Sequence, residues 1–217
     1  MATFIRKYGS FSGSLYEEHE GSYKRATHEY IAQHLLDGKG RAMLARGEYS
    51  EVSTILKKIT HQSGLLAVQE RIALNDAFKD NDATARFAGA VLDFIENLDD
   101  VTFANLVEAT GSLPAASGKA KVLTWPTVTL FPFLARPMDA MFFKPEASKR
   151  LQESFSFDLQ YSPVPNWITY SKLLQISQDL LMRLRPLGAR DLIDVQSFIW
   201  IVFAEPYRTV DDPTVPS

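Results

Sequence analysis

The segment that most constrains the fold runs from Trp125 to Pro145 and reads WPTVTLFPFLARPMDAMFFKP. It combines four prolines with one tryptophan and four phenylalanines. Proline fixes the backbone angle φ, and aromatic side chains carry large apolar areas that favour burial. We therefore expect a rigid, buried segment, here called the aromatic corner. Pro126 and Pro145 suit the first turns of helices, whereas Pro132 and Pro137 should kink or end them.

Apolar side chains recur at helical spacing along most of the chain, and the connections between these segments are short. The expected helices cover 22–37, 49–62, 65–80, 83–97, 100–110, 145–155, 166–186 and 192–203, and another begins at Trp125. No alternation of strands and helices indicates an α/β sheet, and at most a minor extended segment is expected near 157–165. The predicted fold class is all-α, a compact multi-helix bundle of about eight to ten helices.

The length of 217 residues fits a single helical domain over 1–217. The loop GSLPAASGK allows a subdivision into two helical halves, 1–111 and 112–205. The proline-rich segment 206–217 is expected to be a flexible tail. Helix 192–203 is apolar on nearly all sides from Phe198 onward, so we expect it to lie at the centre of the bundle.

Composition excludes several classes of protein. The chain has no cysteine, which removes disulfides, iron–sulfur clusters and thiol nucleophiles. The longest apolar run, FIWIVFA at 198–204, is far shorter than the roughly 18 residues that a membrane span requires. The first residues lack the apolar core of a secretion signal. We expect a soluble, cytoplasmic protein that has no membrane partner.

No motif assigns a reaction to this chain. His28 and His34 are six residues apart, which places them on opposite sides of a helix, so no metal site is expected. The sequence contains neither a nucleophile elbow nor a phosphate-binding loop. We therefore predict no cofactor and no catalytic residue, and the protein is more readily explained as a binding protein than as an enzyme.

Positive charge is concentrated in the second half of the chain. Residues 111–190 hold 10 Lys and Arg against 5 Asp and Glu, whereas residues 1–110 hold 12 against 16. This excess suggests a surface that engages a protein or a nucleic acid. The candidate contact residues are Lys119, Lys121, Lys144, Lys149 and Arg150. Alternatively, these side chains only solvate separate helix faces.

Four polar residues border the aromatic corner or lie on helices that enter the core. They are Lys144, Tyr170, Asp194 and Gln196. Asp194 needs a hydrogen-bonding partner if it is buried, and Lys144, Arg190 or a backbone amide could supply it. Two hypotheses remain open for this group. Its members line the pocket of an enzyme or a ligand site, or they form a buried network that fixes the packing of helices.

Several short motifs are similar to those of a group of bacterial proteins that have no established activity. The matching segments are Trp125–Pro126, Phe131–Leu134, Met141–Pro145, Asn166–Tyr170 and Asp191–Trp200, with a looser match at Glu20–Lys24. The resemblance covers the second half of the chain well and the first half loosely. Members of that group occur beside or fused to defence proteins, which implies a role in binding a nucleic acid or a partner. The resemblance assigns no catalytic residue.

Overall fold

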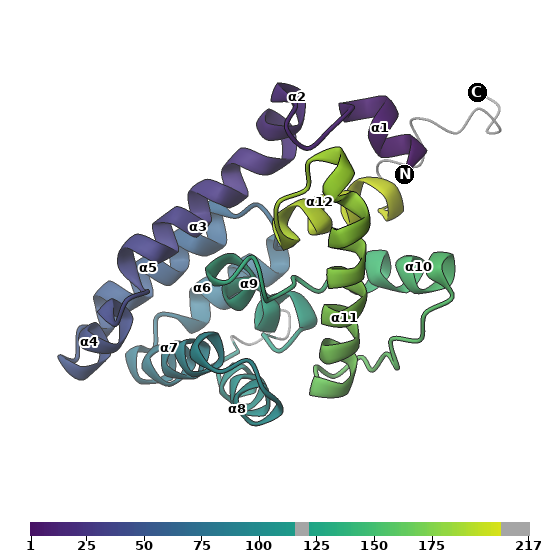
Figure 1. Cartoon of the computed structure of the whole chain (residues 1–217). Coiled ribbons are helices and arrows are strands. Elements are labelled where there is room, and N and C mark those ends of the chain that lie inside the picture. Colours follow the sequence, from purple (N-terminus) through teal and green to yellow (C-terminus); the bar gives the residue numbers. More distant parts are fainter. Residues whose placement is uncertain (116–121, 205–217) are drawn as a thin grey trace.

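The chain folds into packed α-helices in the computed structural model, which describes residues 1–115 and 122–204 (Figure 1). Helix accounts for 72% of the structure, and no strand occurs in the described part of the chain. The α-helices are α1 (Ala2–Tyr8), α2 (Ser14–Tyr16), α3 (Ser22–His34), α4 (Lys39–Ala45), α5 (Tyr49–Gln62), α6 (Val68–Ala77), α7 (Asn81–Glu96), α8 (Asp100–Gly111), α9 (Trp125–Ala135), α10 (Pro145–Phe155), α11 (Trp167–Leu184) and α12 (Leu192–Phe203). The predicted all-α fold is confirmed, with slightly more helices than the eight to ten expected.

Side-chain caps define the starts of three helices in the second half. Thr124, Asn166 and Asp191 each accept a hydrogen bond from a backbone N–H in the first turn of α9, α11 and α12, respectively. Such a cap satisfies a donor that has no partner within the helix. All three helix starts agree with the sequence-based prediction, because the capping residue and the first turn are neighbours in the chain.

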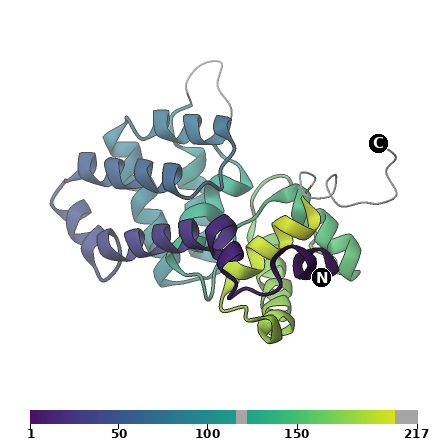
Figure 2. The same cartoon turned by 90° about the horizontal axis from the view of Figure 1, so that it is seen from above.

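The N-terminal segment contains helices that the sequence pattern did not predict. They are α1, α2 and a π-helix over Glu17–Gly21 that leads into α3. Phe4 stacks on Phe11 with ring centroids 4.2 Å apart and lies 5.7 Å from Phe198 of α12. Figure 2 shows α1 beside α12. Short helices are marginal alone, so these aromatic contacts stabilise the segment.

Most of the aromatic corner is buried, although Met138 is 49% exposed. All residues of α9 are buried, and Trp125 stacks on Phe143 with centroids 4.3 Å apart. The indole Nε1 of Trp125 donates a hydrogen bond of 2.8 Å to the backbone oxygen of Ser162. This bond ties the irregular segment 157–165 to the corner, and no strand forms there.

Pro132 does not end α9, contrary to expectation. The helix continues to Ala135, and Pro137 follows it directly after Arg136. A proline inside a helix costs about 3 kcal/mol because it removes one hydrogen bond and crowds the preceding turn. Burial of α9 on all sides offsets that cost, a contribution that local propensity does not include.

Helix α12 packs mainly among the helices of the second half and the N-terminal segment, a narrower position than the centre of the whole bundle that the sequence predicts. Nine of its 12 residues are buried, and it packs against α1, α9, α10, α11 and the π-helix. Three of the buried residues, Asp194, Gln196 and Ser197, are polar. Their partners determine whether this helix carries a site or only a packing interface.

Candidate functional site

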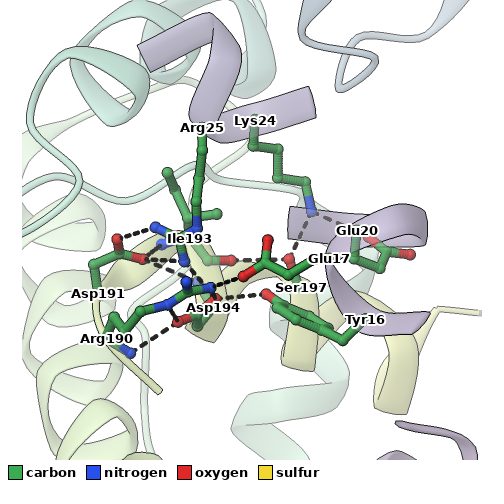
Figure 3. A network of polar contacts seen from close by, with 10 residues as sticks. All are labelled: Tyr16, Glu17, Glu20, Lys24, Arg25, Arg190, Asp191, Ile193, Asp194 and Ser197. Atoms are coloured by element: carbon green, nitrogen blue, oxygen red, sulfur yellow. Dashed lines mark hydrogen bonds and ion pairs between the residues drawn. The ribbon is translucent and has the colours of Figure 1, made fainter. Parts of the chain in front are cut away.

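Buried charges from the two ends of the chain meet at the start of α12 (Figure 3). The carboxylate of Asp194, which is fully buried, accepts hydrogen bonds from Tyr16 Oη at 2.6 Å, Arg25 Nη2 at 2.7 Å and the Arg190 backbone N at 2.8 Å. Arg25 also donates to Asp191 at 2.6 Å. Because both oxygens of Asp194 have partners, its burial as a charged group is compensated.

Two of the three partners suggested for Asp194 are present. The Arg190 guanidinium donates to it at 3.2 Å through Nε, and the backbone amide that binds it is also that of Arg190. Lys144 is not a partner, because its Nζ donates to the backbone oxygen of Leu65 at 3.3 Å. Lys144 and Asp194 therefore belong to different parts of the molecule.

Lys24 of α3 extends the same cluster into the core. Its side chain is fully buried, and its Nζ donates to Glu20 Oε2 at 3.1 Å and to Ser197 Oγ at 2.7 Å. Ser197 in turn donates to the backbone oxygen of Ile193 at 2.9 Å. Burial lowers the pKa of Lys24, and the adjacent Glu20 carboxylate partly offsets this effect.

We refer to these connected polar groups as the α12 network. It comprises Tyr16, Glu17, Glu20, Lys24, Arg25, Arg190, Asp191, Asp194 and Ser197. Each cation in it contacts a carboxylate, and each carboxylate contacts a cation. Arg25 Nε is buried without a hydrogen-bond partner among the described residues, but the pairing of the charges favours one arrangement of helices. These contacts support the hypothesis that Asp194 has a packing role.

Buried tyrosines make the stability of the fold sensitive to alkaline pH. Burial raises the pKa of Tyr8 from 10.0 to about 12, and burial also raises the pKa values of Tyr16 and Tyr170. Above a pH of about 10, tyrosines of the unfolded chain lose protons before those of the folded protein, so stability is lost as pH rises. Lys24 has the opposite effect on stability at pH values between its lowered pKa and its ordinary value of 10.5. In that range the unfolded chain holds a proton that the folded protein lacks.

We therefore expect the midpoint of urea unfolding to fall steadily above a pH of about 10. Absorbance at about 295 nm would report tyrosine ionisation in the same samples, with the buried tyrosines ionising only as the protein unfolds. Tyr16→Phe removes one contributing group and should reduce the slope. A midpoint that is independent of pH in this range would contradict the prediction.

The contacts of Tyr170 in α11 also belong to the packing of the core. Its hydroxyl donates to the backbone oxygen of Met141 at 3.1 Å and accepts from the backbone N of the same residue at 3.1 Å. Its ring stacks on Phe103 with centroids 4.7 Å apart. The side chain is fully buried, so it joins the aromatic corner to α8 and does not line a pocket with Lys144.

An open cleft lies between the aromatic corner, α10 and the end of α12. It has a volume of about 560 Å³, and six of the 15 described residues that line it are aromatic residues or prolines. They are Trp125, Pro126, Pro145, Tyr161, Pro163 and Trp200. We call this the outer cleft. It is within the size range of sites that bind small ligands or peptide segments.

Four charged residues line the outer cleft: Glu70, Lys144, Glu146 and Arg150. Glu70 accepts hydrogen bonds from the Ala67 backbone N and the Thr124 hydroxyl, both at 3.0 Å. Lys144 has no carboxylate partner among the described residues, and its Nζ lies 5.8 Å from the ring centroid of Trp200. The positive charge of Lys144 is thus available to a ligand.

A second, smaller pocket adjoins the outer cleft. It has a volume of about 80 Å³ and shares Lys144 and Trp200 with the cleft. Lys24 and Gln196 also line it. We call this the inner pocket. It places the buried end of the α12 network next to the outer cleft, a juxtaposition that the sequence did not predict.

The remaining candidate residues do not form one surface in the part of the chain that the structure describes. Arg150 lines the outer cleft, and its Nη1 donates to the backbone oxygen of Phe203 at 2.8 Å. Lys149 pairs with Glu146 at 3.4 Å, and its Nζ lies 4.6 Å from the ring centroid of Tyr161. The predicted contact residues Lys119 and Lys121, and the predicted tail 206–217, lie outside the residues that the structure describes.

Sequence analysis identified Lys144, Arg150 and Gln196 but missed the groups around them. Tyr161, Trp200 and Lys24 are far apart in the chain and meet only in the folded structure. Lys24 lies within a helix that was predicted, at a position typical of a solvated cation. The apolar character of α12 predicts that Trp200 packs against other elements. It does not predict that Trp200 lines a cleft.

Comparisons with models of known protein families, with curated proteins and with solved structures find no match. Over 1–115 and 122–204, the histidines, aspartates and glutamates form no group of three or more that would suit a metal ion. Within the same ranges, no helix combines the length and the apolar character needed to cross a bilayer. The two adjoining pockets are therefore the features of this structure that point to a function.

Proposed function

We propose that this protein is a binding protein that holds a peptide segment of a partner protein in the outer cleft. The observation that carries the proposal is the combination of aromatic and proline side chains with Lys144, a cation for which the described residues supply no carboxylate. Aromatic grooves of this kind suit extended peptides that present apolar side chains. A carboxylate on the same peptide would complement Lys144.

The charges of the outer cleft favour a peptide over a nucleic acid. Among the described residues of the lining, Lys144 and Arg150 are matched in number by Glu70 and Glu146. Binding to nucleic acids depends on several cations that neutralise phosphates along a track. Within the described part of the chain, equal numbers of cations and carboxylates line the cleft and Lys144 has no carboxylate partner, which suits a ligand with a single negative group.

The same lining favours binding over catalysis. Glu70 is the best-placed general base, but its two oxygens accept hydrogen bonds from the start of α6 and from Thr124 of the α9 cap. A base that abstracts a proton must reach the substrate directly or through one water. Glu70 instead acts as part of the scaffold that holds the wall of the cleft.

Selection from a peptide library tests the proposal. A library of random peptides displayed with free C-termini would be panned on the wild-type protein, and the enriched peptides would be synthesised. We expect them to carry apolar residues and to lose at least about tenfold in affinity for Trp200→Ala, because removing a central aromatic contact costs about 2 kcal/mol. The affinity is measured by fluorescence anisotropy.

Trp167→Ala is the matched control, because Trp167 is also half-buried but lines a different pocket at the start of α11. It should leave the affinity unchanged. Enriched peptides that bind both variants equally well would overturn the proposal. A single-stranded oligonucleotide that binds in a strongly salt-dependent way, and that Trp200→Ala weakens, would instead indicate a nucleic-acid partner.

A further inference from the structure

We infer that the inner pocket binds the C-terminal carboxylate of the peptide, an inference that rests on the proposed function and specifies which part of the partner enters. The pocket is a short polar recess beside the outer cleft, and Lys144 and Trp200 line both spaces. A chain that lies in the outer cleft can therefore end in the inner pocket without crossing another element.

The cations of the inner pocket suit a carboxylate. The ammonium group of Lys24 has three N–H donors, of which Glu20 and Ser197 accept two. Lys144 donates to one backbone oxygen at the long distance of 3.3 Å, and no described carboxylate pairs with it. Both lysines line the pocket, so a carboxylate placed there would accept charge-assisted hydrogen bonds from each.

Gln196 distinguishes a peptide C-terminus from a simple anion. Its side chain is 5% exposed, and its Oε1 is buried without a hydrogen-bond partner among the described residues. A buried acceptor without a partner is unfavourable by about 1–3 kcal/mol, so the pocket favours a ligand that brings a donor. A peptide C-terminus carries a backbone N–H next to its carboxylate. The carboxylate would pair with the two lysines, and the N–H would donate to Gln196 Oε1.

The size of the inner pocket limits what can enter. Its volume of about 80 Å³ is far smaller than the 560 Å³ of the outer cleft. A carboxylate and a small terminal side chain fit this space, whereas a chain of nucleotides does not. The rings of Tyr23, Phe142 and Trp200 line the pocket and would contact the terminal side chain.

Two small probes test the inference directly. N-acetylalanine carries a carboxylate next to an N–H, and N-acetylalanine amide lacks only the negative charge. In ¹⁵N–¹H NMR spectra, we expect N-acetylalanine to shift the Gln196 side-chain amide and the Trp200 indole signals, while the indole of Trp167 stays unchanged. The amide probe should bind at least about tenfold more weakly, because hydrogen bonds to charged groups are the stronger ones.

Substitutions of single lysines test which side chain gives the preference for the carboxylate probe. Lys144→Met should reduce the preference for the carboxylate probe, because only Lys24 then donates to it, and Lys172→Met, which changes a lysine beside Phe157, should preserve it. Equal binding of the two probes, shifts centred on Trp167, or no shift at Gln196 up to the solubility limit would each overturn the inference. Because these probes are too short to span the outer cleft, this outcome is independent of whether selected peptides bind there.

Discussion

Asp194→Ala is expected to lower the free energy of unfolding by about 3–5 kcal/mol, the usual cost of removing one partner from a buried ion pair. The substitution leaves Arg25 and the hydroxyl of Tyr16 without their shared acceptor in the core. It also removes the acceptor for the Arg190 backbone amide at the entry to α12. Urea unfolding followed by circular dichroism measures the change.

Asp179→Ala is the control for this experiment. Asp179 is an exposed residue of α11, and its substitution should change stability by no more than about 0.5 kcal/mol. Asp194→Asn retains the shape of the side chain without its charge, so we expect an intermediate loss. If Asp194→Ala proves as stable as the control, the α12 network does not stabilise the fold, and the hypothesis of a functional site at Asp194 regains support.

Phe131→Ala should also lower the free energy of unfolding by about 3–5 kcal/mol, because it opens a cavity in a well-packed core. Phe131 lies in α9, is 1% exposed, and contacts Phe87 and Phe78 with ring centroids 5.5 and 6.3 Å apart. The neighbouring rings belong to α7 and the end of α6, so the side chain joins the two halves of the sequence.

Phe155→Ala is the matched control, since Phe155 at the end of α10 is exposed and its removal leaves no internal cavity. Phe131→Leu keeps most of the buried volume and should cost less than Phe131→Ala. The measurement is again the free energy of unfolding from urea titrations. Equal losses for Phe131→Ala and Phe155→Ala would show that the aromatic corner is not the tightly packed core described above.

The two structural substitutions separate stability from binding. The α12 network and the aromatic corner hold the helices, whereas Lys144 and Trp200 are half-buried at the edge of both pockets. Sequence analysis placed Lys144 and Asp194 in one group, because both border the aromatic corner or the last helix. The structure separates them, because the cations that bind Asp194 are Arg25 and Arg190 and not Lys144.

Helix boundaries illustrate what local information can predict. Thr124, Asn166 and Asp191 cap helices through bonds to residues two or three positions later, so the relevant atoms are all present in a short stretch of sequence. The exception is Pro132, for which local propensity predicts a break. Its helix persists because burial, which depends on distant segments, outweighs the local cost.

The sequence by itself determined the all-α class, the burial of most of the aromatic corner and the mainly apolar, buried character of α12. These properties follow from periodicity and apolar content, which are local or averaged over one segment. Only the tertiary structure decided that Tyr16 and Asp194, 178 residues apart, share a hydrogen bond, and that Lys24 reaches the pocket beside Lys144. Such contacts depend on how helices cross, and side-chain chemistry along one chain does not specify which distant partners will meet.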